Sequence, residues 1–205
     1  TAIPRGHGPD LFIFAHERIG GWVDAGLVAP FDGRENGSIF GSMLPQTMAA
    51  VRYRDEVYGL PLAFKSLALF YNRALVDAPP ATASDLLTMG VSLKERGIYA
   101  LAYPASSFYF HAPWYFGWGA ELLARDGESG FSSEGAIRSF EFVHTLAERG
   151  LIPQEASGAL VTQLFNEGRA AMVMSGPWFV GEVGADINYG VATLPAVVGE
   201  TRPSR

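Results

Sequence analysis

Short apolar runs alternate with helical patterns along most of this chain, and this alternation constrains its fold more than any other feature. An unbroken apolar run such as 66–72 is typical of a strand that is buried on both faces. The segments between such runs carry apolar residues every three or four positions, which is the spacing of a helix with one buried face. Strands that alternate with helices predict an α/β fold. Strands are expected at 11–14, 66–72, 99–102, 170–174 and 189–195, and helices at 19–27, 43–50, 84–96, 133–149 and 157–165.

Three finer expectations follow from the same pattern. Residues 51–60 read as a hairpin, 31–41 as a loop, and Ser84 is a possible cap of the helix that Gly97 ends. Residues from Ser66 to Pro195 are expected to form one compact α/β lobe. Its predicted core is Leu67, Leu69, Phe70, Leu101, Phe140, Val143, Met172, Val173 and Val191.

The stretch from Tyr103 to Trp118 is crowded with aromatic side chains and has almost no aliphatic ones. It starts as a loop and then turns helical. Rings with polar tips suit a ligand that has an apolar face and a polar rim, and a sugar is such a ligand. The alternative is a helix whose rings fill the core. The pattern alone leaves both interpretations open.

Charge and cysteine content exclude several classes of function. The net charge is −6, with 15 Lys and Arg against 21 Asp and Glu, which argues against a nucleic-acid partner. Cysteine is absent, so disulfides, thiolate metal sites and thiol catalysis are excluded. No metal-ligand spacing is present and no cofactor is expected. No apolar run approaches the length of a membrane span.

A polar turn follows the apolar run 11–14 and precedes a helical pattern. In open α/β sheets such a turn lies at the carboxyl end of a strand, where ligands bind. Glu17 and Arg18 are therefore candidate ligands of hydroxyl groups, and a surface ion pair is the alternative.

Five segments together carry a resemblance to a known family. They are GPDLFIFAHERIGGWVDAGLVAPFD, AVRYRDEVYGLPLAF, ALFYNRALV, FNEGRAAMVMSGPW and INYGVATLP, in that order. The chain resembles the family-1 extracellular solute-binding proteins of sugar ABC transporters, above all the maltose/maltodextrin-binding members. The resemblance implies an α/β fold of periplasmic-binding-protein-like (type II) lobes that close on sugar by a hinge. It implies a partial first lobe in residues 1–63, a nearly complete second lobe in 64–197 and the start of a crossover back to the first lobe in 198–205.

The resemblance also implies binding residues, beginning with four in the first third of the chain. Phe14 stands where the family has a stacking Trp. Glu17 and Arg18 match an acid–arginine pair. Lys65 stands where the maltose-binding members have a Glu, which reverses a charge.

Four further positions lie in the second lobe. Tyr109 matches a stacking Tyr, and Phe110 follows it as in the family. Trp178 matches the stacking Trp of a GPW turn. Ser107 stands where a Glu would bind hydroxyls, so one charged contact is replaced.

These residues imply the substrate-binding component of a maltodextrin-type importer, or a fragment of it. Its partners would be the sugar and the membrane subunits of the transporter, and its location periplasmic or extracellular. A glycoside hydrolase would need two facing carboxylates, and Glu17 alone has a defensible place, so no enzyme is expected. The other alternative is a structural or interaction module that kept the fold and lost the ligand, which the changes at Lys65 and Ser107 favour.

Overall fold

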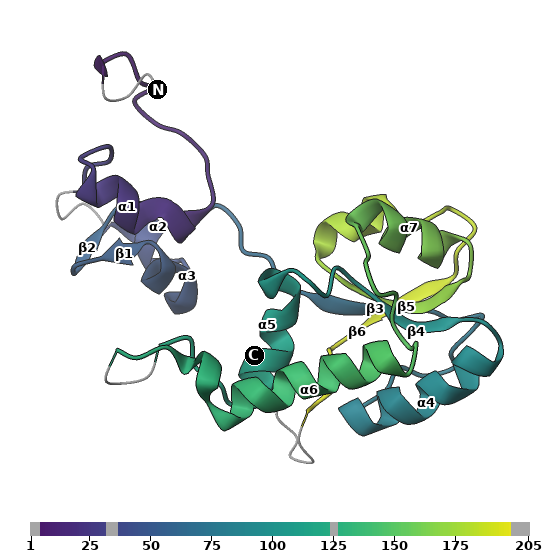
Figure 1. The fold of residues 1–205 in the computed structure, drawn as a ribbon. Coiled ribbons are helices and arrows are strands. Elements are labelled where there is room, and N and C mark those ends of the chain that lie inside the picture. The colour runs from purple at the N-terminus through teal and green to yellow at the C-terminus, as the bar shows by residue number, and fades with distance from the viewer. Residues whose placement is uncertain (1–4, 32–36, 124–126, 198–205) are drawn as a thin grey trace. The chain divides into compact units, whose positions relative to one another are not determined.

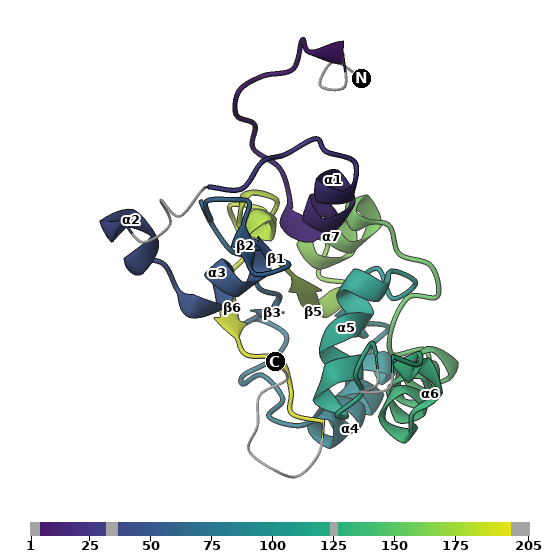
Figure 2. The same cartoon turned by 90° about the vertical axis from the view of Figure 1, so that its left-hand side faces the viewer.

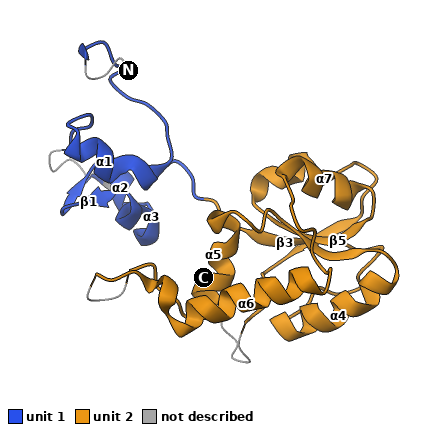
Figure 3. Ribbon diagram, in the orientation of Figure 1, with its two compact units in different colours: residues 1–64 blue, residues 65–205 orange. Residues whose placement is uncertain are grey.

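The computed structural model describes residues 5–31, 37–123 and 127–197 (Figure 1). The chain divides into two compact units, residues 1–64 and 65–205 (Figure 3). The predicted crossover in 198–205 lies outside the described residues.

Unit 1 is built from short elements. They are η2 (His16–Arg18), α1 (Ile19–Asp24), α2 (Ser38–Gly41), α3 (Pro45–Ala50), β1 (Arg52–Tyr53) and β2 (Glu56–Val57). β1 and β2 pair antiparallel, which confirms the predicted hairpin. Arg54 and Asp55 form its turn with φ of 48° and 68°, as a two-residue hairpin turn requires. α2 lies inside the predicted loop 31–41, of which 32–36 are outside the described residues.

The buried strand predicted at 11–14 is wrong. These residues form no regular element, and Leu11 and Ile13 are each 82% exposed. A strand is buried only when neighbours pair with it, and the described part of unit 1 offers only the β1–β2 hairpin as a sheet. Instead, the rings of Phe12 and Phe14 pack edge-on against Trp22, at 5.1 and 5.4 Å between centroids.

Unit 2 is organised around a four-stranded mixed sheet. Its strands are β3 (Ala68–Asn72), β4 (Tyr99–Ala102), β5 (Ala170–Ser175) and β6 (Tyr189–Ala192), in the order β4-β5-β3-β6. β4 and β5 run parallel, whereas β3 is antiparallel to both β5 and β6. The four strands predicted in this part of the chain are confirmed, with somewhat shorter bounds for β3 and β6.

Helices cover both faces of this sheet and complete the predicted α/β lobe (Figure 1). α4 (Ala83–Glu95), α5 (Phe108–Gly117) and α6 (Glu134–Glu148) pack on one face, where Leu69 and Met172 lie. α7 (Gly158–Asn166) and η5 (Pro177–Gly181) pack on the other, with Phe70 and Val173. Successive strand residues point to opposite faces, so β3 and β5 supply both cores. A short η4 (Gly130–Ser132) precedes α6.

The helix ends follow local chemistry. Thr82, not Ser84, caps α4: its hydroxyl accepts from the Asp85 amide at 3.1 Å, and the Asp85 carboxylate accepts from the Thr82 amide at 2.9 Å. This reciprocal pair is a capping box. Gly97, with φ of 72°, follows the end of the helix as predicted.

The predicted core is right in the sheet and wrong on α6 and the sheet edge. Leu69, Phe70, Leu101, Met172 and Val173 are buried, and Leu67 and Val143 are partly buried. Phe140 and Val191 are 44% and 56% exposed, so these two predictions are wrong. Val191 lies on the edge strand β6, and the buried face of α6 instead carries Ala136, Ser139, Phe142 and Leu146.

A polar contact explains why α6 turns a serine inward. His111 of α5 is buried, and its Nε2 lies 3.0 Å from Ser139 Oγ. The hydroxyl donates to the Ala136 carbonyl at 2.7 Å, so it accepts from the imidazole N–H. The imidazole also stacks on Phe140, with 4.4 Å between ring centroids. α5 and α6 lie side by side in Figures 1 and 2, and a buried hydrogen bond between His111 and Ser139 joins them.

Low pH should lower the stability of unit 2 through the buried His111. Burial lowers the pKa of His111 below its ordinary value, so the unfolded chain takes up the proton at higher pH than the folded chain does. The free energy of unfolding should therefore fall as the pH drops through about 6.5 and below. Urea unfolding at pH 7 and pH 5 measures this loss, and His111→Gln should reduce it. His16→Gln, which removes an exposed imidazole of η2 in unit 1, is the control and should leave the His111 contact and this loss in place. If His111→Gln and the control lose the same free energy of unfolding between pH 7 and pH 5, the loss does not come from His111.

Candidate functional site

The turn after β5 places one aromatic ring in the core and the next one at the surface. β5 ends at Ser175, and Pro177 opens η5. Phe179 is 2% exposed and packs against Phe70 at 5.0 Å between centroids, whereas Trp178 is 39% exposed. Trp178 thus stands next to a buried ring, which anchors η5, and is itself partly exposed to solvent.

Gly176 fixes where this indole lies. A Cβ at Gly176 would come within 2.1 Å of Trp178 Cζ3 and within 2.6 Å of two more indole atoms. The indole therefore rests on a backbone that has no side chain, and only glycine leaves that space. The resemblance marked Trp178 of the GPW turn as a stacking residue, and no signal in the sequence marked the role of Gly176.

Tyr109 lies beside Trp178. It sits in the first turn of α5, is 51% exposed, and its ring centroid lies 6.4 Å from that of Trp178 at an interplanar angle of 40°. Phe110 packs edge-on against Tyr109 at 5.3 Å and reaches into the core. The two exposed rings form one tilted aromatic surface, which can stack with the C–H face of a ligand.

Two predicted polar residues of unit 2 lie near these rings, one in space and one in sequence. Lys65 Nζ lies 5.2 Å from the centroid of the Trp178 ring, a cation–π contact. Ser107 is the N-cap residue of α5, half-buried, and its side chain makes no capping hydrogen bond. The structure thus brings Lys65, Tyr109 and Trp178 together and leaves the Ser107 hydroxyl at the start of the same helix.

The aromatic stretch is divided between core and surface, so each of its two interpretations describes part of it. Tyr103, Trp114 and Tyr115 are fully buried, and burial raises the pKa of Tyr103. Phe108 and Tyr109 are exposed. α5 carries rings of both groups, because its first turn is exposed and its later residues Trp114 and Tyr115 are buried.

Three further predicted site residues lie in unit 1. Phe14 is 60% exposed, and the Arg18 guanidinium carbon lies 5.8 Å from the centroid of its ring. Glu17 is exposed in η2. That these three residues form one site with Tyr109 and Trp178 stays a prediction.

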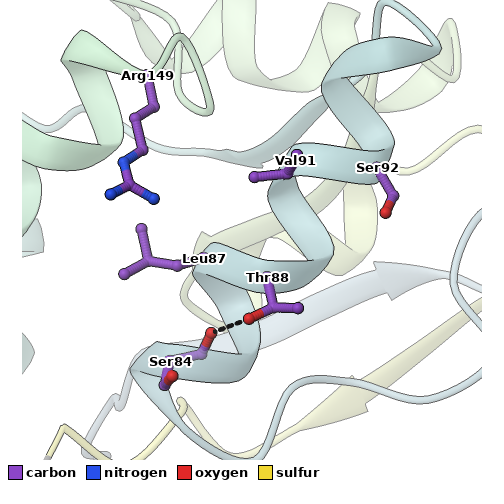
Figure 4. A pocket seen from close by; sticks show the side chains of 6 residues that line it. All are labelled: Ser84, Leu87, Thr88, Val91, Ser92 and Arg149. Atoms are coloured by element: carbon purple, nitrogen blue, oxygen red, sulfur yellow. Dashed lines mark hydrogen bonds between the residues drawn. The ribbon is translucent and has the colours of Figure 1, made fainter.

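Two hollows on the described surface of unit 2 are lined by none of these predicted site residues. A shallow hollow on α4 is lined by Ser84, Leu87, Thr88, Val91, Ser92 and Arg149 (Figure 4). The described residues that line it include no aromatic ring and no carboxylate. The Thr88 hydroxyl donates a hydrogen bond to the Ser84 carbonyl at 3.0 Å. No group of three or more His, Asp or Glu among the described residues could hold a metal ion. No described helix is long and apolar enough to cross a membrane.

Comparison with known proteins places the chain in a family. The family model described as bacterial extracellular solute-binding protein matches residues 1–202. The chain belongs to this solute-binding protein family. Its α/β lobe agrees with that membership.

Several curated solute-binding relatives are named for oligosaccharides. The maltotriose-binding protein of Pyrococcus abyssi is 31% identical over 201 residues, which are 97% of this chain and 44% of that protein. The maltodextrin-binding protein MdxE of Bacillus subtilis is 28% identical, over 95% of this chain and 49% of that protein. The galactooligosaccharide-binding protein of the same organism is 27% identical, over 94% and 48%. The chain spans about half the length of these relatives.

Gly176→Ala should displace the Trp178 indole without removing any polar or aromatic group, because the new methyl group would occupy the space of the ring. The ¹H–¹⁵N signal of the Trp178 indole, assigned with Trp178→Phe, should shift strongly. Gly181→Ala in the same turn meets nothing within 4 Å and is the matched control. An indole signal that stays in place in Gly176→Ala would contradict this packing.

Proposed function

We propose that this chain is part of the substrate-binding component of a carbohydrate ABC importer, and that it binds a maltodextrin-type oligosaccharide. The observation that carries the proposal is the exposed pair Tyr109 and Trp178, which lie side by side at the starts of α5 and η5. The names of the solute-binding relatives support the ligand class.

Each site residue has a physical role in this proposal. The C–H face of a sugar ring stacks on the Trp178 indole or on Tyr109, and Phe110 supports Tyr109 from behind. Lys65 and Ser107 hydrogen-bond hydroxyl groups at the edge of the rings. Phe14, Glu17 and Arg18 of unit 1 act as contacts from the first lobe, and closure of the lobes excludes water.

The proposal includes a location and a partner. One relative is a maltooligosaccharide ABC transporter solute-binding lipoprotein of Streptococcus pneumoniae, 27% identical over 94% of this chain. A periplasmic or extracellular location agrees with this relative and with the family description. The membrane subunits of a transporter would then receive the sugar.

Binding rather than catalysis fits the site. The solute-binding relatives are named as binding proteins, not enzymes. Hydrolysis of a glycosidic bond would need two carboxylates that flank the sugar. Tyr109, Lys65 and Trp178 supply rings and a cation instead.

Removal of either exposed ring should abolish sugar binding and spare the fold. Saturation-transfer difference NMR with maltotriose, which detects weak binding, should show a signal for the unaltered chain and none for Trp178→Ala or Tyr109→Ala. Both variants should unfold in urea within about 1 kcal/mol of the unaltered chain, because both rings lie partly exposed at the surface and outside the buried clusters.

Phe179→Ala is the matched control, because it removes the buried ring next to Trp178. It should cost about 3–5 kcal/mol of stability. Equal losses of stability in all three variants would place Tyr109 and Trp178 in the core. A lobe that folds but gives no maltotriose signal in the unaltered chain would favour a module that has lost its ligand.

A further inference from the structure

Lys65 has an unusual position for a surface lysine. Its ammonium group lies over the indole of Trp178, 5.2 Å from the ring centroid. It is one of two lysines in the chain. The other, Lys94, donates to the main-chain carbonyl of Arg149 at the end of α6. Lys65 is therefore the lysine that accompanies the aromatic surface.

The ammonium group is left with unused hydrogen-bonding capacity. Within the described residues no carboxylate forms an ion pair with Lys65. Glu182, which follows η5, accepts from the Thr162 hydroxyl instead. An ammonium has three N–H donors, and an aromatic face attracts the charge without satisfying them as hydrogen bonds. A ligand that brings a carboxylate would complete this contact.

The geometry brings a stacked ligand to the same ammonium. The indole rests on Gly176 and has Tyr109 beside it, with 6.4 Å between the ring centroids. Trp178 is 39% exposed, so a sugar that packs on the exposed part of the indole lies next to Lys65. A carboxylate on that sugar adds the attraction of opposite charges to the hydrogen bond that the ammonium donates.

We propose that the sugar unit that stacks on Trp178 carries a carboxylate, so that the ligand is a uronate-containing oligosaccharide, and that Lys65 determines this specificity. The inference rests on the oligosaccharide-binding part of the proposed function, because it uses the same aromatic pair. It replaces the neutral maltodextrin of that proposal with an acidic ligand class. The preference for the acidic sugar should be about tenfold, which corresponds to one charge-assisted hydrogen bond.

The test compares three α-linked trisaccharides on the 205-residue chain. The probes are trigalacturonate, its fully methyl-esterified form and maltotriose, each titrated while the Trp178 indole N–H is followed by NMR. Trigalacturonate should bind about tenfold more tightly than the ester, and added NaCl should weaken only the acidic ligand. Lys65→Met should remove the preference, and Lys65→Arg should keep most of it. Lys94→Met removes the same charge elsewhere and should change nothing.

Each outcome decides between the two proposals. Equal affinity for trigalacturonate and its ester, or a preference that survives in Lys65→Met, overturns the acidic ligand class and leaves carbohydrate binding standing. An indole signal that none of the three sugars moves overturns the proposed function and this inference with it.

Discussion

The double burial of β5 is the constraint on which unit 2 depends. All six residues of this strand are buried, and it is paired on one side with β4 and on the other with β3. Met172 and Met174 enter one hydrophobic cluster and Val173 enters the other, so α6 and α7 both pack on the same strand. The strand then ends at Ser175, where the chain turns outward into Trp178. The position of Trp178 is thus set by a strand at the centre of the sheet.

The sheet was predictable because burial on both faces leaves a strong mark in the sequence. Unbroken apolar runs at 66–72 and 170–174 became β3 and β5 for this reason. The run at 11–14 carries the same mark and forms no strand, since pairing depends on neighbours that a local pattern does not show. The prediction that Phe140 lies on the buried face of α6 was wrong for a related reason. Which face of α6 is buried depends on the contact between Ser139 and His111, which are far apart in the sequence.

The candidate site was partly predictable as well. Aromatic crowding near Tyr109 and the resemblance at Trp178 identified the two rings, and the structure shows both exposed and adjacent. The resemblance also marked Lys65, but its place over the indole was not foreseeable, because that contact arises only after the sheet has formed. Gly176 left no signal of its own. Its role is the absence of a side chain, which becomes visible only beside the ring that fills the space.

The exposed run at 11–14 has a consequence for handling the protein. Together with Ala15 it forms an uncharged segment, LFIFA, rich in residues that favour strands, and Leu11, Ile13 and Phe14 are at least 60% exposed. Such a segment is a template for pairing with an identical one from another molecule. The same side chains that find no sheet within their own unit can build one between molecules. Self-association that grows with protein concentration should therefore begin in unit 1, and a charged residue in this segment should suppress it.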